Sequence, residues 1–130
     1  MVSELTRRRT IAAACCTIAF GGFIVGVGAA SAHATLDHAS PAAGSTVHSA
    51  PQEVLLTFTE RLEPAFSIIE VTDVSGTRVD SGKSEVNGST MRVRLKVLRE
   101  GQYRVRWRAI TPDAHRVDGD FTFDVDSQSR

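Results

Sequence analysis

Two segments of strictly alternating side chains constrain the fold of this chain more than any other feature. Residues 90–97, TMRVRLKV, and residues 103–110, YRVRWRAI, carry an apolar side chain at every second position, with mostly arginine or lysine between them. Successive side chains of a strand point to opposite faces, so this pattern predicts two strands, each with one face on a core and one in water. The expected inward residues are Met91, Val93, Leu95, Val97, Tyr103, Val105, Trp107 and Ala109. The segment that joins the two strands is short and contains Gly101, which predicts a hairpin.

Three further segments read as strands. They are EVLLTFT at 53–59, SIIEVTD at 67–73 and DFTFDV at 120–125. Turn-forming residues fall at 40–45, 49–52, 74–77, 86–89 and 111–115. No segment has a helical period. About seven short strands in fewer than 100 residues predict an all-β fold, an immunoglobulin-like antiparallel β-sandwich or Greek-key barrel.

The first 32 residues have the order of a secretory signal. Three arginines at 7–9 precede an apolar run at 10–28, and Ala30-Ser31-Ala32 has the small-x-small form of a cleavage site. Cleavage after Ala32 would leave a domain of residues 33–130 outside the cytoplasm, soluble and with no membrane span. An uncleaved anchor is the alternative, and both the general and the twin-arginine export routes stay open. Both cysteines, Cys15 and Cys16, lie in the signal, so residues 33–130 can form no disulfide or thiolate ligand.

Charge argues against nucleic acid as a partner. Residues 33–130 contain 12 basic and 14 acidic side chains, a net charge of −2, whereas phosphate binding needs a basic excess or stripe. One set of arginines invites a nucleic-acid or anionic-lipid interpretation. It comprises Arg92, Arg94, Arg104, Arg106 and Arg108. We interpret these as the solvated face of two strands, where charge also hinders edge-to-edge pairing.

With cysteine absent, histidines are the main candidates for transition-metal ligands. All four lie after the cleavage site, at His33, His38, His48 and His115. Cleavage after Ala32 would make His33 the N-terminal residue, so that its α-amine and ring Nδ1 could chelate one ion. In an extended segment Asp113 and His115 would point the same way, with Cα atoms about 6.5 Å apart. Three nitrogens and one oxygen suit tetragonal Cu(II). Pro112-Asp113 is also a common turn opening, so from spacing alone a plain exposed turn stays open.

Three blocks of the sequence resemble the CopC family of periplasmic copper-binding proteins. HATLDHASPAAGS at 33–45 resembles the mature start of that family, and residues 50–73 continue the likeness through Phe58, Thr59 and Glu60. The most specific block is GQYRVRWRAITPDAHRVDGDFTFDV at 101–125, where Tyr-x-Val-x-Trp-Arg, Asp-x-His and Gly-x-Phe-x-Phe recur at matching intervals. The resemblance covers essentially all of residues 33–130.

The resemblance implies an immunoglobulin-like β-barrel that holds one Cu(II) per chain. The ligands it implies are His33 through its amine and ring, Asp113 and His115. Glu60 matches a family acid that orients a ligand from outside the coordination shell, or it is a surface charge at a strand end. The resemblance also implies a periplasmic role in copper homeostasis and resistance, beside an inner-membrane CopD-type copper transporter as partner.

Two departures from the family pattern matter. Some members bind Cu(I) in a methionine-rich loop, but Met91 is the only methionine after the signal and its alternating strand places it in the core, so we expect no Cu(I) site. Ala114 stands between Asp113 and His115, where many members carry glycine or another small residue, and it should not disturb the ligands. His38 and His48 match no ligand position and are expected to be solvent-exposed.

A copper carrier or buffer competes with two other classes of function. A terminal histidine and a second histidine on copper are also the brace of lytic polysaccharide monooxygenases, but Tyr103 and Trp107 are expected to point inward instead of forming a flat aromatic surface. A directly bound aspartate would also fill a position that oxygen needs, so we expect no enzyme. A metal-free structural sandwich is the third class. A blue-copper electron carrier is excluded because its site needs a cysteine thiolate.

Overall fold

Eight β-strands form in the part of the chain that the computed structural model describes, residues 34–127. They are β1 (Leu36–Ser40), β2 (Thr46–Val47), β3 (Glu53–Phe58), β4 (Ile68–Asp73), β5 (Asp80–Asn87), β6 (Thr90–Leu95), β7 (Gly101–Ile110) and β8 (Arg116–Val125). These residues contain no helix, and therefore none that is long and apolar enough to cross a membrane. The all-β class is confirmed. The predicted signal, residues 1–32, lies outside the described residues, and so does His33.

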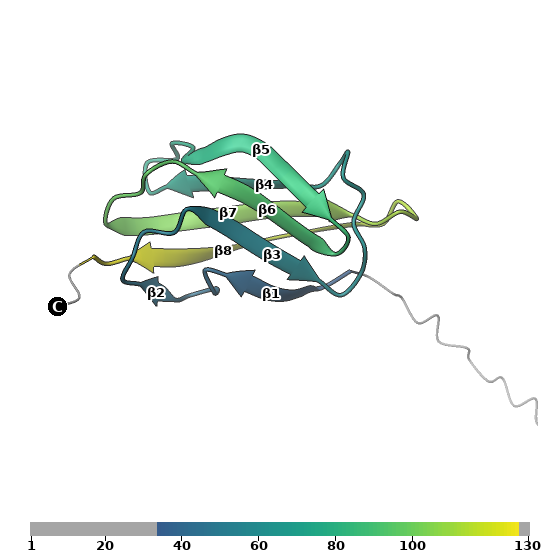
Figure 1. Cartoon of the computed structure of the whole chain (residues 1–130), viewed down its shortest axis with the longest axis horizontal. Coiled ribbons are helices and arrows are strands. Elements are labelled where there is room, and N and C mark those ends of the chain that lie inside the picture. Colours follow the sequence, from purple (N-terminus) through teal and green to yellow (C-terminus); the bar gives the residue numbers. More distant parts are fainter. Residues whose placement is uncertain (1–33, 128–130) are drawn as a thin grey trace, which may run out of the picture. The chain divides into compact units, whose positions relative to one another are not determined.

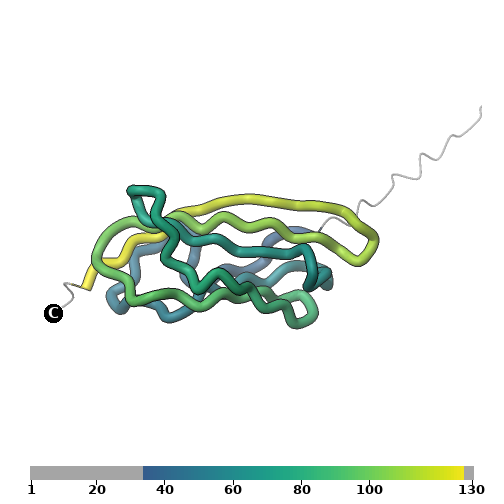
Figure 2. Tube along the Cα trace, turned by 90° about the horizontal axis from the view of Figure 1, so that it is seen from above, coloured from purple at the N-terminus to yellow at the C-terminus, as the bar shows by residue number. Residues whose placement is uncertain are grey.

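The strands form two four-stranded sheets that face each other. One sheet has the order β1-β3-β6-β5 and the other β2-β8-β7-β4 (Figure 1). In Figure 2 the yellow-green chain of β7 and β8 runs along one layer and the green chain of β5 and β6 along the other. Every pairing is antiparallel except that of β2 with β8, which is parallel and joins Thr46 to Asp124 and Val47 to Val125. The predicted β-sandwich is confirmed, with eight strands where about seven were expected.

The core lies between the sheets. Most of its side chains are alternate residues of the strands, and Ala34, Leu62 and Leu98 join them from outside the strands. Its buried apolar side chains are Ala34, Val54, Leu56, Phe58, Leu62, Ile69, Val71, Met91, Val93, Leu98, Tyr103, Val105, Ala109, Phe123 and Val125. Trp107 is half-buried, and its ring meets the Phe58 ring edge-on with centroids 5.0 Å apart. The predicted inward face of 103–110 is therefore confirmed. In 90–97 the prediction is wrong for Val97, which is 97% exposed because β6 ends at Leu95.

The predicted hairpin between the two alternating segments is wrong, because β6 and β7 belong to different sheets. Residues 96–100 cross from one sheet to the other. Leu98 is buried in the core on the way, and the Tyr103 hydroxyl donates a hydrogen bond of 2.7 Å to the Arg99 carbonyl at the corner, as in the tyrosine corner of immunoglobulin-like sandwiches. The hairpins of this region are instead β5–β6 and β7–β8.

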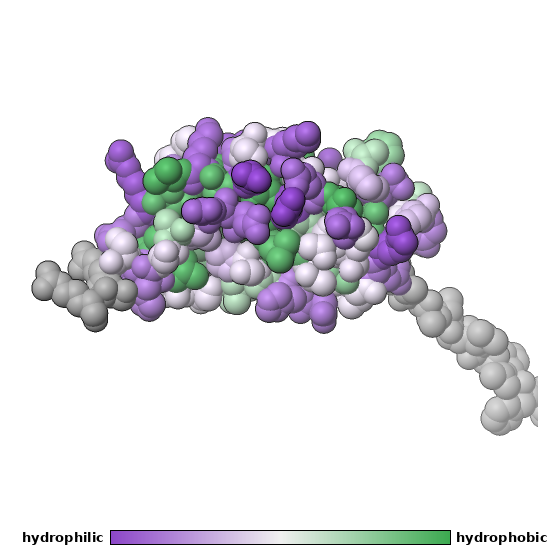
Figure 3. All heavy atoms as spheres, viewed as in Figure 1, coloured by the Kyte–Doolittle hydropathy of each residue, from purple (hydrophilic) through white to green (hydrophobic). Residues whose placement is uncertain are grey.

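This crossing divides the arginines between two surfaces. Arg92 and Arg94 lie on β6, whereas Arg104, Arg106 and Arg108 lie on β7 in the other sheet. Several face acids, as in the contacts of Arg92 with Glu85 at 2.7 Å and of Arg104 with Asp120 at 3.7 Å. On the face shown in Figure 3, over β1, β3, β6 and β5, hydrophilic side chains are interspersed with apolar ones. The arginines do not form one basic stripe, and the cross-strand neighbours of the other three are also acids, with Glu53 opposite Arg94, Asp120 opposite Arg106 and Asp118 opposite Arg108.

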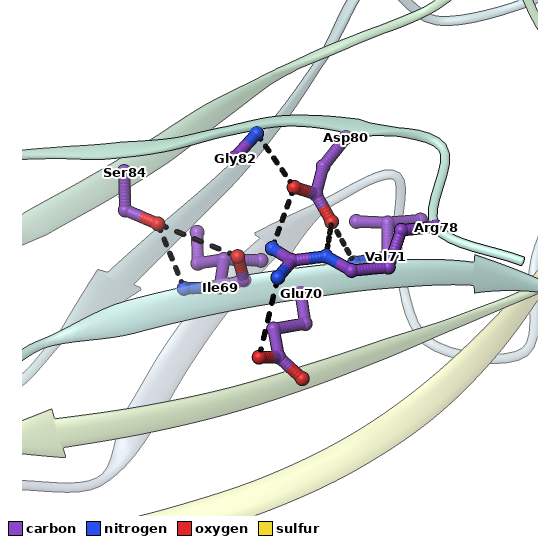
Figure 4. A network of polar contacts seen from close by, with 7 residues as sticks. All are labelled: Ile69, Glu70, Val71, Arg78, Asp80, Gly82 and Ser84. Carbon is purple, nitrogen blue, oxygen red and sulfur yellow. Dashed lines mark hydrogen bonds and ion pairs between the residues drawn. The ribbon is translucent and has the colours of Figure 1, made fainter.

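Side chains of β5 cover the outer edge of β4 and close the sandwich on that side (Figure 4). The Ser84 hydroxyl accepts from the Ile69 amide at 2.8 Å, and an oxygen of the Asp80 carboxylate accepts from the Val71 amide at 2.8 Å. Next along β4, the Val71 carbonyl accepts from the amide of Val79, which directly precedes β5, at 2.9 Å. An edge strand with open amides is a template for aggregation, and here the amides at 69 and 71 are occupied.

Asp80 is the centre of this edge, because its side chain is fully buried and accepts four hydrogen bonds. Besides the Val71 amide, the donors are the Gly82 amide at 2.8 Å and the Arg78 guanidinium at 2.7 and 3.1 Å. Burial alone would raise the pKa of Asp80, but the bonds from Arg78 and the two amides outweigh it and lower the pKa below its ordinary value. Gly82 has a φ of 82°, which favours glycine, at the irregularity in the β5–β6 register.

Candidate metal site

The predicted ligands Asp113 and His115 lie in the turn that joins β7 to β8. Residues 111–115 are not the extended segment on which the prediction rested. The Thr111 amide donates to the His115 carbonyl at 3.0 Å, the Ala114 amide donates to the Thr111 carbonyl at 2.9 Å, and Ala114 has a φ of 67°. The two side chains do lie together, but the tight turn and not strand alternation brings them together. That both bind one ion stays a prediction.

The Asp113 carboxylate contacts its neighbours through both oxygens. Its Oδ2 lies 2.7 Å from Nδ1 of the His115 ring, and its Oδ1 accepts a short hydrogen bond from the Thr111 hydroxyl. These contacts, the Thr111 bond first and the His115 bond second, lower the pKa of Asp113. The carboxylate is therefore ionised at neutral pH. More than half of the surface of each of the Asp113 and His115 side chains is exposed, so solvent ions can reach both.

The described chain begins at a fixed point beside the residue predicted to be the third ligand. His33 itself lies outside the described residues, but the next residue, Ala34, is only 1% exposed. Thr35 is held to Thr59 by three contacts, which join the Thr35 amide to Thr59 Oγ1 at 3.0 Å, the Thr59 amide to the Thr35 carbonyl at 3.0 Å, and the two hydroxyls at 3.2 Å. The chain is thus anchored two residues after His33.

The loop between β3 and β4 connects this anchor to the end of β7. The Glu63 amide donates to the Ile110 carbonyl at 2.6 Å, and the Ile110 amide donates to the buried Ser67 hydroxyl at 3.1 Å. Ile110 directly precedes the 111–115 turn. In Figure 1 the tip of the β7–β8 hairpin and the start of β1 accordingly lie at the same end of the sandwich. The half-buried Glu60 lies in this loop, just after Thr59.

The remaining histidines are exposed, as expected. His38 lies on the edge strand β1, and His48 follows β2 at the opposite end of the sandwich, where its Nδ1 is 3.2 Å from the Asp126 carbonyl (Figure 1). Among residues 34–127 no group of three or more histidine, cysteine, aspartate or glutamate side chains is placed to hold a metal ion. Within that range the structure brings together two of the predicted ligands, Asp113 and His115.

Thr111 is the residue of this site that the sequence analysis missed. It contacts both Asp113 and His115, whereas the sequence analysis includes it only within the turn-forming range 111–115. A threonine two residues before an aspartate at a turn is a recognisable signal, because threonine hydroxyls commonly bond to groups two to four residues away.

The comparison with protein families gives a match to the CopC domain over residues 36–126. The chain is 34% identical over 117 residues to copper resistance protein C of Escherichia coli, covering 81% of this chain and 91% of that protein. It is 38% identical over 98 residues to the copper transport protein CutJ of Bacillus subtilis (strain 168). That match covers 72% of this chain but only 18% of the length of CutJ.

A solved structure has the same fold. The crystal structure of CopC from Methylosinus trichosporium OB3b superimposes with a TM-score of 0.70 at 31% sequence identity, and the match covers 75% of this chain and 98% of that one. At this identity the likeness extends beyond the fold to the family.

Proposed function

This chain belongs to the CopC family, and from this premise we propose that it is a periplasmic Cu(II) carrier or buffer in copper homeostasis and resistance. One ion per chain is held by the amine and ring of His33, by Asp113 and by His115. The observation that carries the proposal is the 2.7 Å contact between Asp113 and His115, made at the end of the sandwich where the chain is anchored by Thr35. Removal of residues 1–32 would supply the amine.

The donor atoms support copper in its divalent state. Imidazole, amine and carboxylate suit Cu(II), whereas Cu(I) prefers thiolate and thioether. Residues 33–130 contain no cysteine, and their single methionine, Met91, is fully buried in the core. The His115 ring can bind an ion through Nε2 while Asp113 holds Nδ1, or through Nδ1 once the ion replaces the shared proton. Only the second arrangement places the Asp113 carboxylate and the His115 ring on the same ion, and it is the one we propose.

We infer delivery to a membrane transporter of the CopD type, and no catalysis. The match to CutJ supports this, because there a stretch similar to this chain is part of a longer copper transport protein. A polysaccharide-cleaving enzyme would need an exposed flat aromatic surface. Tyr103 is only 5% exposed, and Trp107 packs against Phe58 and over Gly119. We propose that Glu60, which follows the anchor residue Thr59, orients the terminal amine or a ligand from outside the coordination shell.

The proposal is tested by moving the terminal amine. Protein that begins at His33 is compared with protein that carries one additional alanine before His33, by competition titration with Cu(II), electron paramagnetic resonance and metal analysis after dialysis. Loss of a partner outside the coordination shell typically costs 10- to 100-fold in affinity, so separating amine from ring should cost at least about 100-fold.

Histidine variants provide the matched control. His115→Ala should lose a nitrogen ligand and weaken Cu(II) binding, whereas His48→Ala, at the opposite end of the sandwich, should bind as the parent does. Unchanged affinity and spectrum in the extended protein would contradict the proposed coordination. Protein that starts at His33 and retains no copper after dialysis would instead indicate a metal-free structural module.

A further inference from the structure

The Thr111 hydroxyl joins the two proposed ligands that the structure describes. It donates to Asp113 Oδ1 and accepts from the His115 amide at 3.2 Å. Thr111 is only 1% exposed, although the side chains of Asp113 and His115 are mostly in solvent. A buried polar group at the base of an exposed pair of donors is placed to orient them.

We propose that Thr111 is a positioning residue of the Cu(II) site, holding the Asp113 carboxylate so that Oδ2 faces His115. This inference rests on the proposed function. An exposed aspartate would otherwise rotate freely about two torsions. The bond to Oδ1 restricts that rotation and leaves the second oxygen at 2.7 Å from the ring. The hydroxyl itself is fixed because threonine is β-branched, which restricts χ1, and because the side chain is enclosed.

The turn backbone has its own support, which separates positioning from folding. The Thr111 amide bonds to the His115 carbonyl and the Ala114 amide bonds to the Thr111 carbonyl, and both contacts use only main-chain atoms. Thr111→Val removes the hydroxyl, with its bonds to Asp113 and to the His115 amide, but keeps these two main-chain bonds and nearly the same shape. Thr111→Ser keeps the hydroxyl and removes the methyl group. The pair of variants therefore separates the hydrogen bond from the packing.

The experiment uses protein that begins at His33, with Thr72→Val on β4 as a control for the same substitution far from the turn. We expect Thr111→Val to lower the Cu(II) affinity by about 10- to 100-fold, the usual cost of losing a partner outside the coordination shell. Its electron paramagnetic resonance spectrum should also change. Thr111→Ser and Thr72→Val should keep the parent affinity and spectrum.

Parent-like binding by Thr111→Val would overturn the inference, and so would an equal loss in Thr111→Ser, which would assign the effect to packing. A measurement on metal-free protein separates this inference from the proposed function. Nitrogen-15 NMR of the His115 ring reports whether Nδ1 carries the proton that faces Asp113. Thr111→Val should reduce that tautomer, and an unchanged ring would refute positioning even if copper binding were absent from the parent.

Discussion

Asp80→Ala should be among the most destabilising single substitutions at the surface-to-core boundary of this sandwich. The substitution removes a carboxylate that accepts hydrogen bonds from the Val71 amide, the Gly82 amide and the Arg78 guanidinium. Two of these three donor groups can form hydrogen bonds with water instead, because Gly82 is exposed and the Arg78 side chain is 44% exposed. The Val71 amide cannot bond to water, because Val71 is fully buried on the edge strand β4.

The magnitude follows from that difference. An unsatisfied buried amide costs about 1–3 kcal/mol, and hydrogen bonds to a charged group contribute about 1.5–3 kcal/mol. Solvent screens the partly exposed Arg78 guanidinium, so its bonds contribute less than buried ones would. We therefore expect a loss of about 2–4 kcal/mol in the free energy of unfolding. Asp80→Asn can still turn one oxygen toward Val71 and should lose about half as much. For a domain of this size each kcal/mol lowers Tm by about 4–8 °C.

Chemical and thermal unfolding, followed by circular dichroism, measure the effect. Asp120→Ala is the matched control, because Asp120 is about half exposed and pairs with Arg104 at 3.7 Å, so its loss should stay within about 0.5 kcal/mol. The expected order of destabilisation is Asp80→Ala, then Asp80→Asn, then Asp120→Ala. If Asp80→Ala and Asp120→Ala unfold at the same denaturant concentration, the closure of the β4 edge does not contribute to stability as argued.

The loss of stability caused by Asp80→Ala should depend on pH. The pKa of Asp80 is lower in the folded than in the unfolded protein, because the bonds from Arg78 and two amides outweigh the effect of burial. The unfolded state therefore takes up the proton first, and the stabilisation is present above the ordinary value of 3.8 and is lost as the pH falls through the lower folded value. The stability difference between parent and Asp80→Ala should be constant from pH 7 to 5 and shrink below about pH 4. A difference that stays constant down to pH 2 would contradict this account.

Two further substitutions test the core and its corner. Tyr103→Phe removes the hydroxyl that donates to the Arg99 carbonyl at 2.7 Å. Denaturant unfolding should show that the free energy of unfolding falls by about 0.5–1.5 kcal/mol. No loss would mean that packing alone holds the corner. Gly119→Ala would place a Cβ 2.6 Å from the Trp107 ring. The resulting overpacking should lower the free energy of unfolding by about 1–3 kcal/mol and shift the tryptophan fluorescence. An unchanged emission spectrum would show that the ring does not pack against this glycine.

Alternation predicted which faces are buried but not which strands are neighbours. Met91, Val93, Val105 and Ala109 all point into the core as their period of two requires. The predicted hairpin between their strands failed, because an apolar face fits either sheet of a sandwich equally well. What separates the sheets is the 96–100 crossing, where buried Leu98 breaks the alternation, and a single buried residue in an irregular segment leaves no periodic signal.

For the site, as for the strands, the sequence indicates which residues are involved but not how they are arranged. Asp113 and His115 could be selected from their chemistry and from the family resemblance, and the structure brings their side chains together. The reason given for their meeting was wrong, because Ala114 adopts a positive φ that an alanine rarely takes. The role of Thr111 could not be found by searching for metal-ligating residue types, since it acts on the ligands through hydrogen bonds.

The contacts that hold the proposed site do not depend on the ion. The apolar core between the sheets and the Asp80 edge stabilise the sandwich, and main-chain bonds with the Thr111 hydroxyl shape the turn. A structural zinc domain differs, because its metal supplies most of the folding free energy and its loss unfolds the chain. Here bound copper would add only the linkage term, about 4 kcal/mol at a free concentration 1,000 times Kd. A sandwich that stays folded with or without the ion can receive copper and release it repeatedly, as a carrier or buffer must. A domain that unfolds when it loses its metal cannot do so.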